Sequence, residues 1–203
     1  MLKCDRNRMQ DKIETFSQFG ATGNGGITRY SLSPEDRKAR DEFVKRMKAI
    51  GANIETDDMA NVYATIPGSE LGLKRIVMGS HCDSVKNGGN YDGILGVMTA
   101  MEVLETIVSQ DIPHRHPLTA MIWTNEEGSL YPPAMMCSGV VCNDYLPKEI
   151  AQGFTKEKML ASKSVLDETK TFGEALDASP YKGDIKNRLN PNDYEDMFEL
   201  HIE

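Results

Sequence analysis

Residues 79–96, with the sequence GSHCDSVKNGGNYDGILG, contain side chains that could bind a divalent cation. His81 and Asp83 lie two residues apart at the end of a predicted strand, and residues i and i+2 of a strand face the same side. His81 can therefore offer one ring nitrogen to a metal, while Asp83 accepts the other ring N–H and fixes the tautomer. Taken alone, such a pair would more often be a coincidence in a surface loop.

Four further side chains carry the same chemistry. Asp92 stands at the start of a predicted helix, where its carboxylate could reach two cations or could simply cap the helix. Glu126 and Glu127 follow a buried strand, and adjacent carboxylates repel each other unless a cation lies nearby or one is protonated, although a solvated acidic turn is the plainer interpretation. His201 lies in a short alternating run, where an isolated histidine is more often structural.

Considered together, these residues favour a metal site over four separate coincidences. Histidine, aspartate and glutamate are ligands that suit Zn²⁺, Mn²⁺ or Co²⁺. A shared carboxylate implies two metals about 3.5–4 Å apart, which would activate a bridging water and polarise a carbonyl. The glutamate that binds no metal would then be the natural general base.

The elements that must position these side chains alternate along the chain. Helix patterns, strand patterns and buried apolar runs predict an α/β fold, with a central mixed sheet flanked by helices and no linker to a second domain. The expected helices span residues 5–19, 34–50 (capped by Ser33 and stopped by Gly51), 91–108 and 151–171. The expected strands span residues 52–55, 61–66, 75–81, 118–124 and 199–203, and a polar loop is expected at 181–193.

The composition fits a soluble enzyme for small molecules, and the cysteine pattern and lack of a secretory signal predict a cytoplasmic protein. The 203 residues carry a net charge of −8, from 31 acidic and 23 basic side chains, which argues against nucleic acid or an anionic membrane as partner. No apolar run approaches the ~18 residues of a membrane span, and the charged N-terminus shows no secretory signal. The four cysteines form no metal-binding pattern and are expected to be reduced thiols, although Cys137 and Cys142 could pair.

The order HxD, GG-x-x-D-G, NEEG and HIE resembles the M20 metallopeptidase superfamily. Within it, the chain is similar to the branch of N-carbamoyl-L-amino acid hydrolases, β-ureidopropionases and allantoate amidohydrolases. The segments that carry this resemblance are GGITRYSLSPEDRKARDEFVKRMKAIG, GSHCDSVKNGGNYDGILGV, WTNEEGSLYPPAMMCSG and FELHIE. The resemblance runs from about residue 25 to the last residue, and the PPAMM and LHIE segments separate this branch from the peptidases.

The resemblance implies a binuclear site for Zn²⁺ or Mn²⁺, with Co²⁺ as a third option. Asp92 would bridge the two metals, His81 and His201 would bind the first, and Glu127 would bind the second. Glu126 would be the general base that passes a proton from the bridging water to the leaving nitrogen.

The resemblance also implies two features that shape the site. Asp83 would orient His81. A cis peptide would follow Asp92 and aim its carboxylate, and Gly93 would reduce crowding on the far side of that bond.

Members of this family are about twice as long as residues 1–203, which would be the N-terminal part of their catalytic domain. The family continues into a lid and dimerisation domain and then supplies a late histidine for the second metal. We therefore expect an incomplete second metal site, no homodimer contact through the lid, and a complementing C-terminal half as a partner.

The reaction implied by the resemblance is metal-dependent hydrolysis of a non-peptide C–N bond in a small linear amide or ureido compound. Whether this chain alone is an enzyme stays open. The alternatives are a catalytically inactive truncated remnant that binds at most one metal, and an aminoacylase or peptidase activity of the M20 type. A metal-free α/β binding module with an accidental motif is a further alternative.

Overall fold

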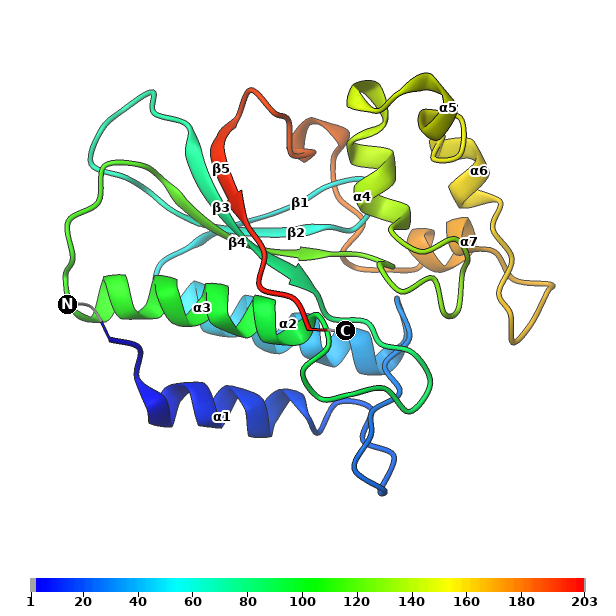
Figure 1. Cartoon of the computed structure of the whole chain (residues 1–203), viewed down its shortest axis with the longest axis horizontal. Helices are drawn as coiled ribbons and strands as arrows, with labels where there is room; N and C mark the ends of the chain where they lie inside the picture. Colours follow the sequence, from blue (N-terminus) through cyan, green and yellow to red (C-terminus); the bar gives the residue numbers. More distant parts are fainter. Residues whose placement is uncertain (1–2, 203) are drawn as a thin grey trace.

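The computed structural model describes residues 3–202 and has a five-stranded mixed sheet at its centre (Figure 1). The strand order is β1-β2-β4-β3-β5. β4 pairs antiparallel with β2 and parallel with β3, and β5 adds to the other edge of β3 in parallel. The strands are β1 Asn53–Thr56, β2 Val62–Ile66, β3 Arg75–His81, β4 Leu118–Trp123 and β5 Tyr194–Phe198. The predicted α/β class with a mixed sheet is confirmed.

Helices cover one face of this sheet in two layers. α2 packs beneath β1 and β2, α3 packs beneath β3 and β4, and α1 lies outside α3 (Figure 1). The shorter helices gather at the end of the sheet where β3 and β4 terminate, and there Lys156 of α6 forms an ion pair with Asp58 of the β1–β2 turn. The helices are α1 Arg6–Phe16, α2 Pro34–Ala49, α3 Ile94–Ser109, α4 Met136–Val141, α5 Lys148–Ala151, α6 Lys156–Leu160 and α7 Phe172–Asp177, with 3₁₀ turns η1 Asn143–Tyr145 and η2 Ile185–Asn187.

The helix starts follow from local hydrogen bonding that the sequence indicates. Ser33 accepts the N–H of Asp36 at the start of α2, with Pro34 in the first helical position, as predicted. Asp5 caps α1 in the same way, by accepting the N–H groups of Asn7 and Arg8. Among residues 3–202, no helix combines the length and apolar character that crossing a bilayer demands. All four cysteines are free thiols, so Cys137 and Cys142 do not pair.

Two predicted elements are wrong. The helix expected at 151–171 is reduced to α6, because Thr155 starts one short helix and Thr171 starts another through a reciprocal capping box with Glu174. The strand expected at 199–203 lies earlier, as β5, and residues 199–202 have no regular secondary structure. Glu203, the last residue of that expectation, lies outside the described residues.

Two buried basic side chains tie α1 to the rest of the fold. Lys12 is fully buried and pairs with Glu102 of α3 at 2.8 Å and with Glu105. Arg29 is 1% exposed and donates to the main-chain carbonyls of Phe16, Phe19 and Cys82. Burial lowers the pKa of Arg29, because in the described part of the chain its hydrogen bonds go to neutral carbonyls rather than to a carboxylate. The end of α1 is therefore linked through one side chain to the residue after β3.

Candidate metal centre

The candidate site lies at the C-terminal end of β3, where the His81 side chain is fully buried. Its Nδ1 lies 3.0 Å from the main-chain carbonyl oxygen of Asp83, whereas the nearest carboxylate oxygen of Asp83 is 3.8 Å away. The expectation that the Asp83 carboxylate accepts the ring N–H therefore names the wrong oxygen. A carbonyl acceptor fixes the same tautomer, with the proton on Nδ1 and Nε2 available to a metal.

The Asp83 carboxylate instead organises the neighbouring strand end. Its two oxygens accept the main-chain N–H groups of Glu126 at 3.3 Å and Glu127 at 3.2 Å. Burial raises the pKa of Asp83, while the two N–H donors and His81 oppose that rise. Asp83 therefore connects the two segments of the site, through its carbonyl to His81 and through its carboxylate to the turn after β4.

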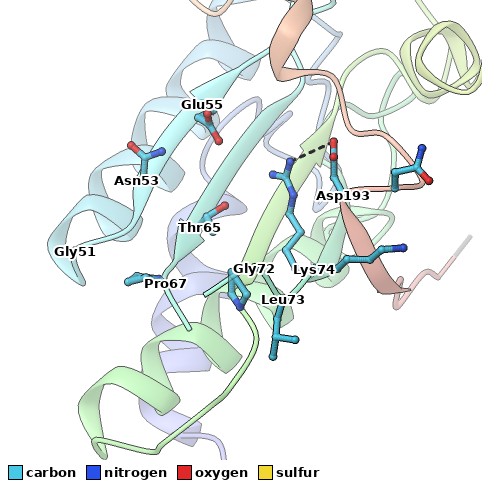
Figure 2. A pocket seen from close by; sticks show the side chains of 12 residues that line it. Gly51, Asn53, Glu55, Thr65, Pro67, Gly72, Leu73, Lys74 and Asp193 are labelled. Atoms are coloured by element: carbon cyan, nitrogen blue, oxygen red, sulfur yellow. Dashed lines mark ion pairs between the residues drawn. The ribbon is translucent and has the colours of Figure 1, made fainter. Parts of the chain in front are cut away.

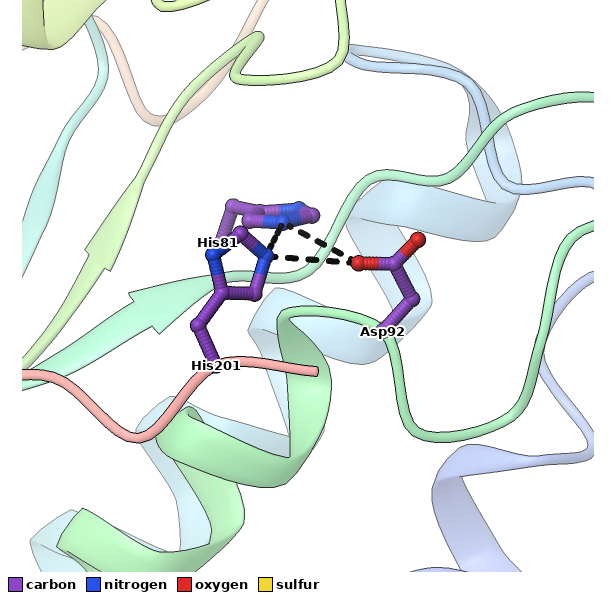
Figure 3. A group of neighbouring side chains, drawn as sticks. All are labelled: His81, Asp92 and His201. Atoms are coloured by element: carbon purple, nitrogen blue, oxygen red, sulfur yellow. Dashed lines mark hydrogen bonds and ion pairs between the residues drawn. The ribbon is translucent and has the colours of Figure 1, made fainter. Parts of the chain in front are cut away.

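Three candidate ligands converge on one point (Figure 3). The Nε2 atoms of His81 and His201 are 3.0 Å apart. Oδ1 of Asp92 lies 3.7 Å from Nε2 of His81 and 3.3 Å from Nε2 of His201. All three residues come from different segments: the end of β3, the turn before α3 and the chain after β5.

These separations fit a common divalent cation. Ligand atoms at about 2.0–2.1 Å from a tetrahedral Zn²⁺ lie about 3.3–3.4 Å from one another. The three observed distances of 3.0, 3.3 and 3.7 Å bracket that value. Two ring nitrogens and a carboxylate oxygen also form the donor set that borderline cations such as Zn²⁺ prefer.

Glu126 borders this cluster. Its Oε2 lies 3.5 Å from Nε2 of His81, and its side chain is 22% exposed. Burial raises the pKa of Glu126, and the nearby charge of Asp83 adds to that rise, while His81 opposes it. A carboxyl group with a raised pKa beside a metal site is suited to accept and return a proton.

Glu127, the next residue along the chain, is close enough to Asp92 and His81 for their charges to shift its pKa. Its Oε1 is buried and has no hydrogen-bond partner among residues 3–202. Burial, reinforced by the charge of Asp92, raises the pKa of Glu127 to about 7. Glu127 does not belong to the three-residue cluster found in the described chain, so the structure brings His81, Asp92 and His201 together and leaves Glu127 beside them.

The turn between β4 and these glutamates depends on Asn125, whose role the sequence analysis missed. Asn125 has φ 53°, a left-handed conformation that asparagine tolerates better than most residues, and its amide donates to the carbonyl of Tyr131 at 2.7 Å. The asparagine of the NEEG segment was a signal that could have indicated this turn.

Gly93 makes room for the His81 ring. A Cβ on Gly93 would lie 2.2 Å from Nε2 of His81, and its φ is 60°. The implied cis peptide between Asp92 and Gly93 is wrong, because among residues 3–202 the cis peptide joins Pro132 to Pro133. With φ 60° and ψ −50°, Gly93 provides the sharp turn into α3, in which the N–H of Ile94 donates to the carbonyl oxygen of Asp92 at 2.6 Å.

A hollow elsewhere on the sheet is remote from this chemistry (Figure 2). It lies at the opposite end of β3, where the lining includes Arg75, whose guanidinium lies 3.9 Å from the carboxylate of Asp193. Asn53 and Glu55 of β1 and Thr65 of β2 are among the residues that line it. Its lining contains no histidine or cysteine, so it offers a metal no side-chain nitrogen or sulfur ligand of the kind that His81 and His201 provide.

The chain matches known proteins along its whole length. The family model described as peptidase family M28 matches residues 61–161, which include every candidate site residue except His201. The N-carbamoyl-L-amino-acid amidohydrolase of Rhizobium meliloti is 30% identical over 201 residues, which are 99% of this chain and 45% of that protein. The allantoate amidohydrolase of Bacillus subtilis is 31% identical over 198 residues, which are 98% of this chain and 45% of that protein.

Solved structures agree with the sequence relatives. An amidase of the hydantoinase/carbamoylase family from Burkholderia multivorans superposes with a TM-score of 0.88 and 37% sequence identity, covering 100% of this chain and 46% of that chain. The chain therefore spans about half the length of the curated relatives and solved structures that it matches.

Proposed function

Since the chain belongs to the hydrolase family that contains the N-carbamoyl-L-amino-acid and allantoate amidohydrolases, we propose that it forms the metal-binding part of an amidohydrolase. The substrate class is a small linear amide or ureido compound, and the bond cleaved is a non-peptide C–N bond. The observation that carries this proposal is the convergence of His81, Asp92 and His201 within 4.8 Å. The four free cysteines support a reducing, cytoplasmic compartment.

His81, Asp92 and His201 would hold the first divalent cation, and Glu127 with the second oxygen of Asp92 would contribute to a second. Zn²⁺ and Mn²⁺ are the candidates, with Co²⁺ as a third, because the donor set is nitrogen and carboxylate oxygen. A bound cation would polarise the substrate carbonyl and lower the pKa of a bound water. The buried, unpartnered Oε1 of Glu127 supports its assignment as a ligand, since a buried carboxylate oxygen is costly without a partner.

Glu126 would be the general base. Its carboxylate borders the cluster without belonging to it, which is the position that proton transfer needs. It would take the proton from the attacking water and deliver it to the leaving nitrogen. Asp83 would hold the turn that carries Glu126 by accepting two main-chain N–H groups from it.

The rest of such a hydrolase would bind along the free edge of β5. β5 pairs with β3 on one side, and in the described chain no strand pairs with its other side. Phe198 at the end of β5, and Leu200 and Ile202 in the segment that follows it, are 59%, 49% and 47% exposed. Apolar side chains exposed next to an unpaired strand are normally covered by another segment, so we propose a complementing half as the partner of this surface.

The test compares hydrolysis by the 203-residue chain with and without a co-expressed second half taken from a full-length relative. Carbamoyl amino acids and allantoate serve as substrates with added Mn²⁺, and acylated amino acids and dipeptides represent the aminoacylase or peptidase alternative. The expected result is hydrolysis of the ureido compounds by the combined halves. This hydrolysis should be lost in the Glu126→Gln variant. It should be kept in the control variant Glu149→Gln, which changes an exposed glutamate of α5 outside the cluster.

Elemental analysis of the purified chain separates the remaining alternatives. About one equivalent of bound metal, with no turnover by the chain alone or together with the second half, would support the alternative of an inactive truncated remnant. Absence of bound metal at micromolar Zn²⁺ would refute the proposed site and favour a metal-free binding module. Turnover of dipeptides alone would replace the amidohydrolase proposal by the peptidase one.

A further inference from the structure

His201 occupies a segment that has already left the sheet. The pairing between β3 and β5 ends at Met78 and Phe198, and residues 199–202 have no regular secondary structure. The ring of His201 nevertheless lies 3.0 Å from that of His81, with the ring centroids 5.0 Å apart. Something other than strand pairing must hold this segment against the end of β3.

One side-chain hydrogen bond joins the two segments beside their histidines. Oγ of Ser80 donates to Oε1 of Glu199 at 2.6 Å. Ser80 is fully buried and immediately precedes His81, and Glu199 lies two residues before His201. A hydroxyl donor to a carboxylate at this distance is a charge-assisted bond, which is among the stronger hydrogen bonds in proteins.

α3 provides the space that this contact requires. A Cβ on Gly96 would lie 2.3 Å from the carbonyl oxygen of Leu200 and 2.8 Å from Cβ of Ser80. The absence of a side chain at Gly96 therefore lets residue 200 approach α3 and lets Ser80 face Glu199. The hydrogen bond to Glu199 and the space beside Gly96 for Leu200 therefore both act on residues 199–200.

We propose that Ser80 and Glu199 are positioning residues that hold His201 at the metal centre. The bond between them acts as a latch, which joins the two segments beyond the last strand pair at Met78 and Phe198. This inference rests on the proposed function in one respect, namely that His201 is a metal ligand. The latch itself concerns the position of the ring, with or without metal.

A different role for Glu199 must be separated from this one. Its carboxylate also lies close enough to Glu126 to raise the pKa of that group, so Glu199 could act through its charge alone. Glu199→Gln distinguishes the two roles, because the carboxamide oxygen can still accept the Ser80 hydroxyl while the charge is removed. Glu199→Ala removes both.

The experiment measures the ring position and the metal affinity on the 203-residue chain. In metal-free protein, the nuclear Overhauser contact between the His81 and His201 rings is recorded, and it is assignable because the chain has 4 histidines. Zn²⁺ affinity is then measured by titration against a competing chelator. The variants are Ser80→Ala, Glu199→Ala, Glu199→Gln and the double alanine variant, with Glu195→Ala on the exposed side of β5 as control.

The latch predicts that both single alanine variants lose the ring contact and bind Zn²⁺ about 10- to 100-fold more weakly, as is typical when a partner that orients a metal ligand is removed. The double variant should be no weaker than either single variant, because both remove the same bond. Glu195→Ala should keep the contact and bind as the wild type does, and Glu199→Gln, which keeps an acceptor but loses the charge, should keep the contact and bind Zn²⁺ more tightly than Glu199→Ala. Unchanged far-ultraviolet dichroism shows that a variant is folded.

Two outcomes would overturn the latch. Retention of the ring contact in Ser80→Ala and Glu199→Ala would show that the segment is held by other means. Equal losses in Glu199→Gln and Glu199→Ala, with no loss in Ser80→Ala, would show that the charge matters rather than the bond. If the wild type binds no Zn²⁺, the proposed function fails, and the metal-free ring contact still decides whether the latch exists.

Discussion

Replacing Asp83 with asparagine separates the two interactions that this residue makes. The main-chain carbonyl that accepts from His81 is unchanged by the substitution. The carboxylate that accepts the N–H groups of Glu126 and Glu127 becomes a carboxamide, which has one acceptor oxygen and one donor group. We therefore expect the damage to appear at the turn after β4 and not at the His81 ring.

The expected size of the effect follows from the buried contacts. One of the two N–H groups keeps an acceptor, and the other faces an NH₂ group with which it cannot bond. An unsatisfied polar group of this kind costs about 1–3 kcal/mol when it is buried. Because burial raises the pKa of Asp83, removing its charge offsets part of that cost, and we expect a loss of about 2 kcal/mol in the free energy of unfolding. For a chain of this length, that loss lowers the melting temperature by about 4–8 °C.

The assay combines stability with two site-specific signals. Thermal unfolding followed by circular dichroism gives the stability change, with Asp144→Asn at an exposed position as the matched control. Amide resonances of Glu126 and Glu127 should shift in Asp83→Asn, while the ring nitrogens of His81 keep their chemical shifts. The reverse pattern, with altered His81 ring nitrogens and unchanged amides, would refute the assignment of the carboxylate to the turn.

Three further predictions concern the site and its support. Gly93→Ala should weaken Zn²⁺ binding roughly tenfold or more in calorimetric titration, because a Cβ would lie 2.2 Å from the His81 ring and φ is 60°. The control variant Gly89→Ala should bind Zn²⁺ as the wild type does, because a Cβ at Gly89 would have no neighbouring atom within 4 Å. Glu102→Gln should lower the unfolding free energy by about 2–3 kcal/mol at pH 7 in urea titration. Burial alone would raise the pKa of Glu102, but hydrogen bonds from Arg8 and Lys12 of α1 outweigh it and lower that pKa to about 2. The difference in unfolding free energy between Glu102→Gln and wild type should therefore be full above about pH 4.5 and vanish as the pH falls toward 2. A difference that persists at pH 2 would contradict this explanation. Removing metal with a chelator should lower the melting temperature of the wild type by about 5–10 °C if Zn²⁺ had been present at 100 times its dissociation constant, and added Zn²⁺ should restore it.

β3, which carries His81, and α2 were predictable because local and tertiary preferences agree there. The run Arg75–His81 is apolar and is followed by polar residues, and it forms β3 with the predicted bounds. Ser33 and Pro34 likewise start α2 where the sequence placed it. At these positions, the residues that favour the element are also the residues that the fold buries or caps.

The failures arise where contacts distant in sequence decide the structure. Residues 199–202 alternate in polarity as a strand does, but Leu200 approaches Gly96 of α3, and the pairing ends before it. The acceptor of the His81 ring N–H could not be predicted, because the choice between the carbonyl and the carboxylate of Asp83 depends on the turn after β4. The types of the candidate ligands could be read from the sequence, whereas the groups that hold them in place could not.

The three main-chain carbonyls that accept hydrogen bonds from Arg29 connect the C-terminal end of α1 to the candidate site, although no residue of α1 lies in that site. A protein shortened to begin after Phe19 would leave this guanidinium with one acceptor, at Cys82, and two empty donor directions inside the molecule. The strand end next to His81 would then be free to shift. Removing α1 should therefore disturb the candidate metal ligands before it disturbs the sheet, so this helix supports the candidate site from behind as well as covering α3.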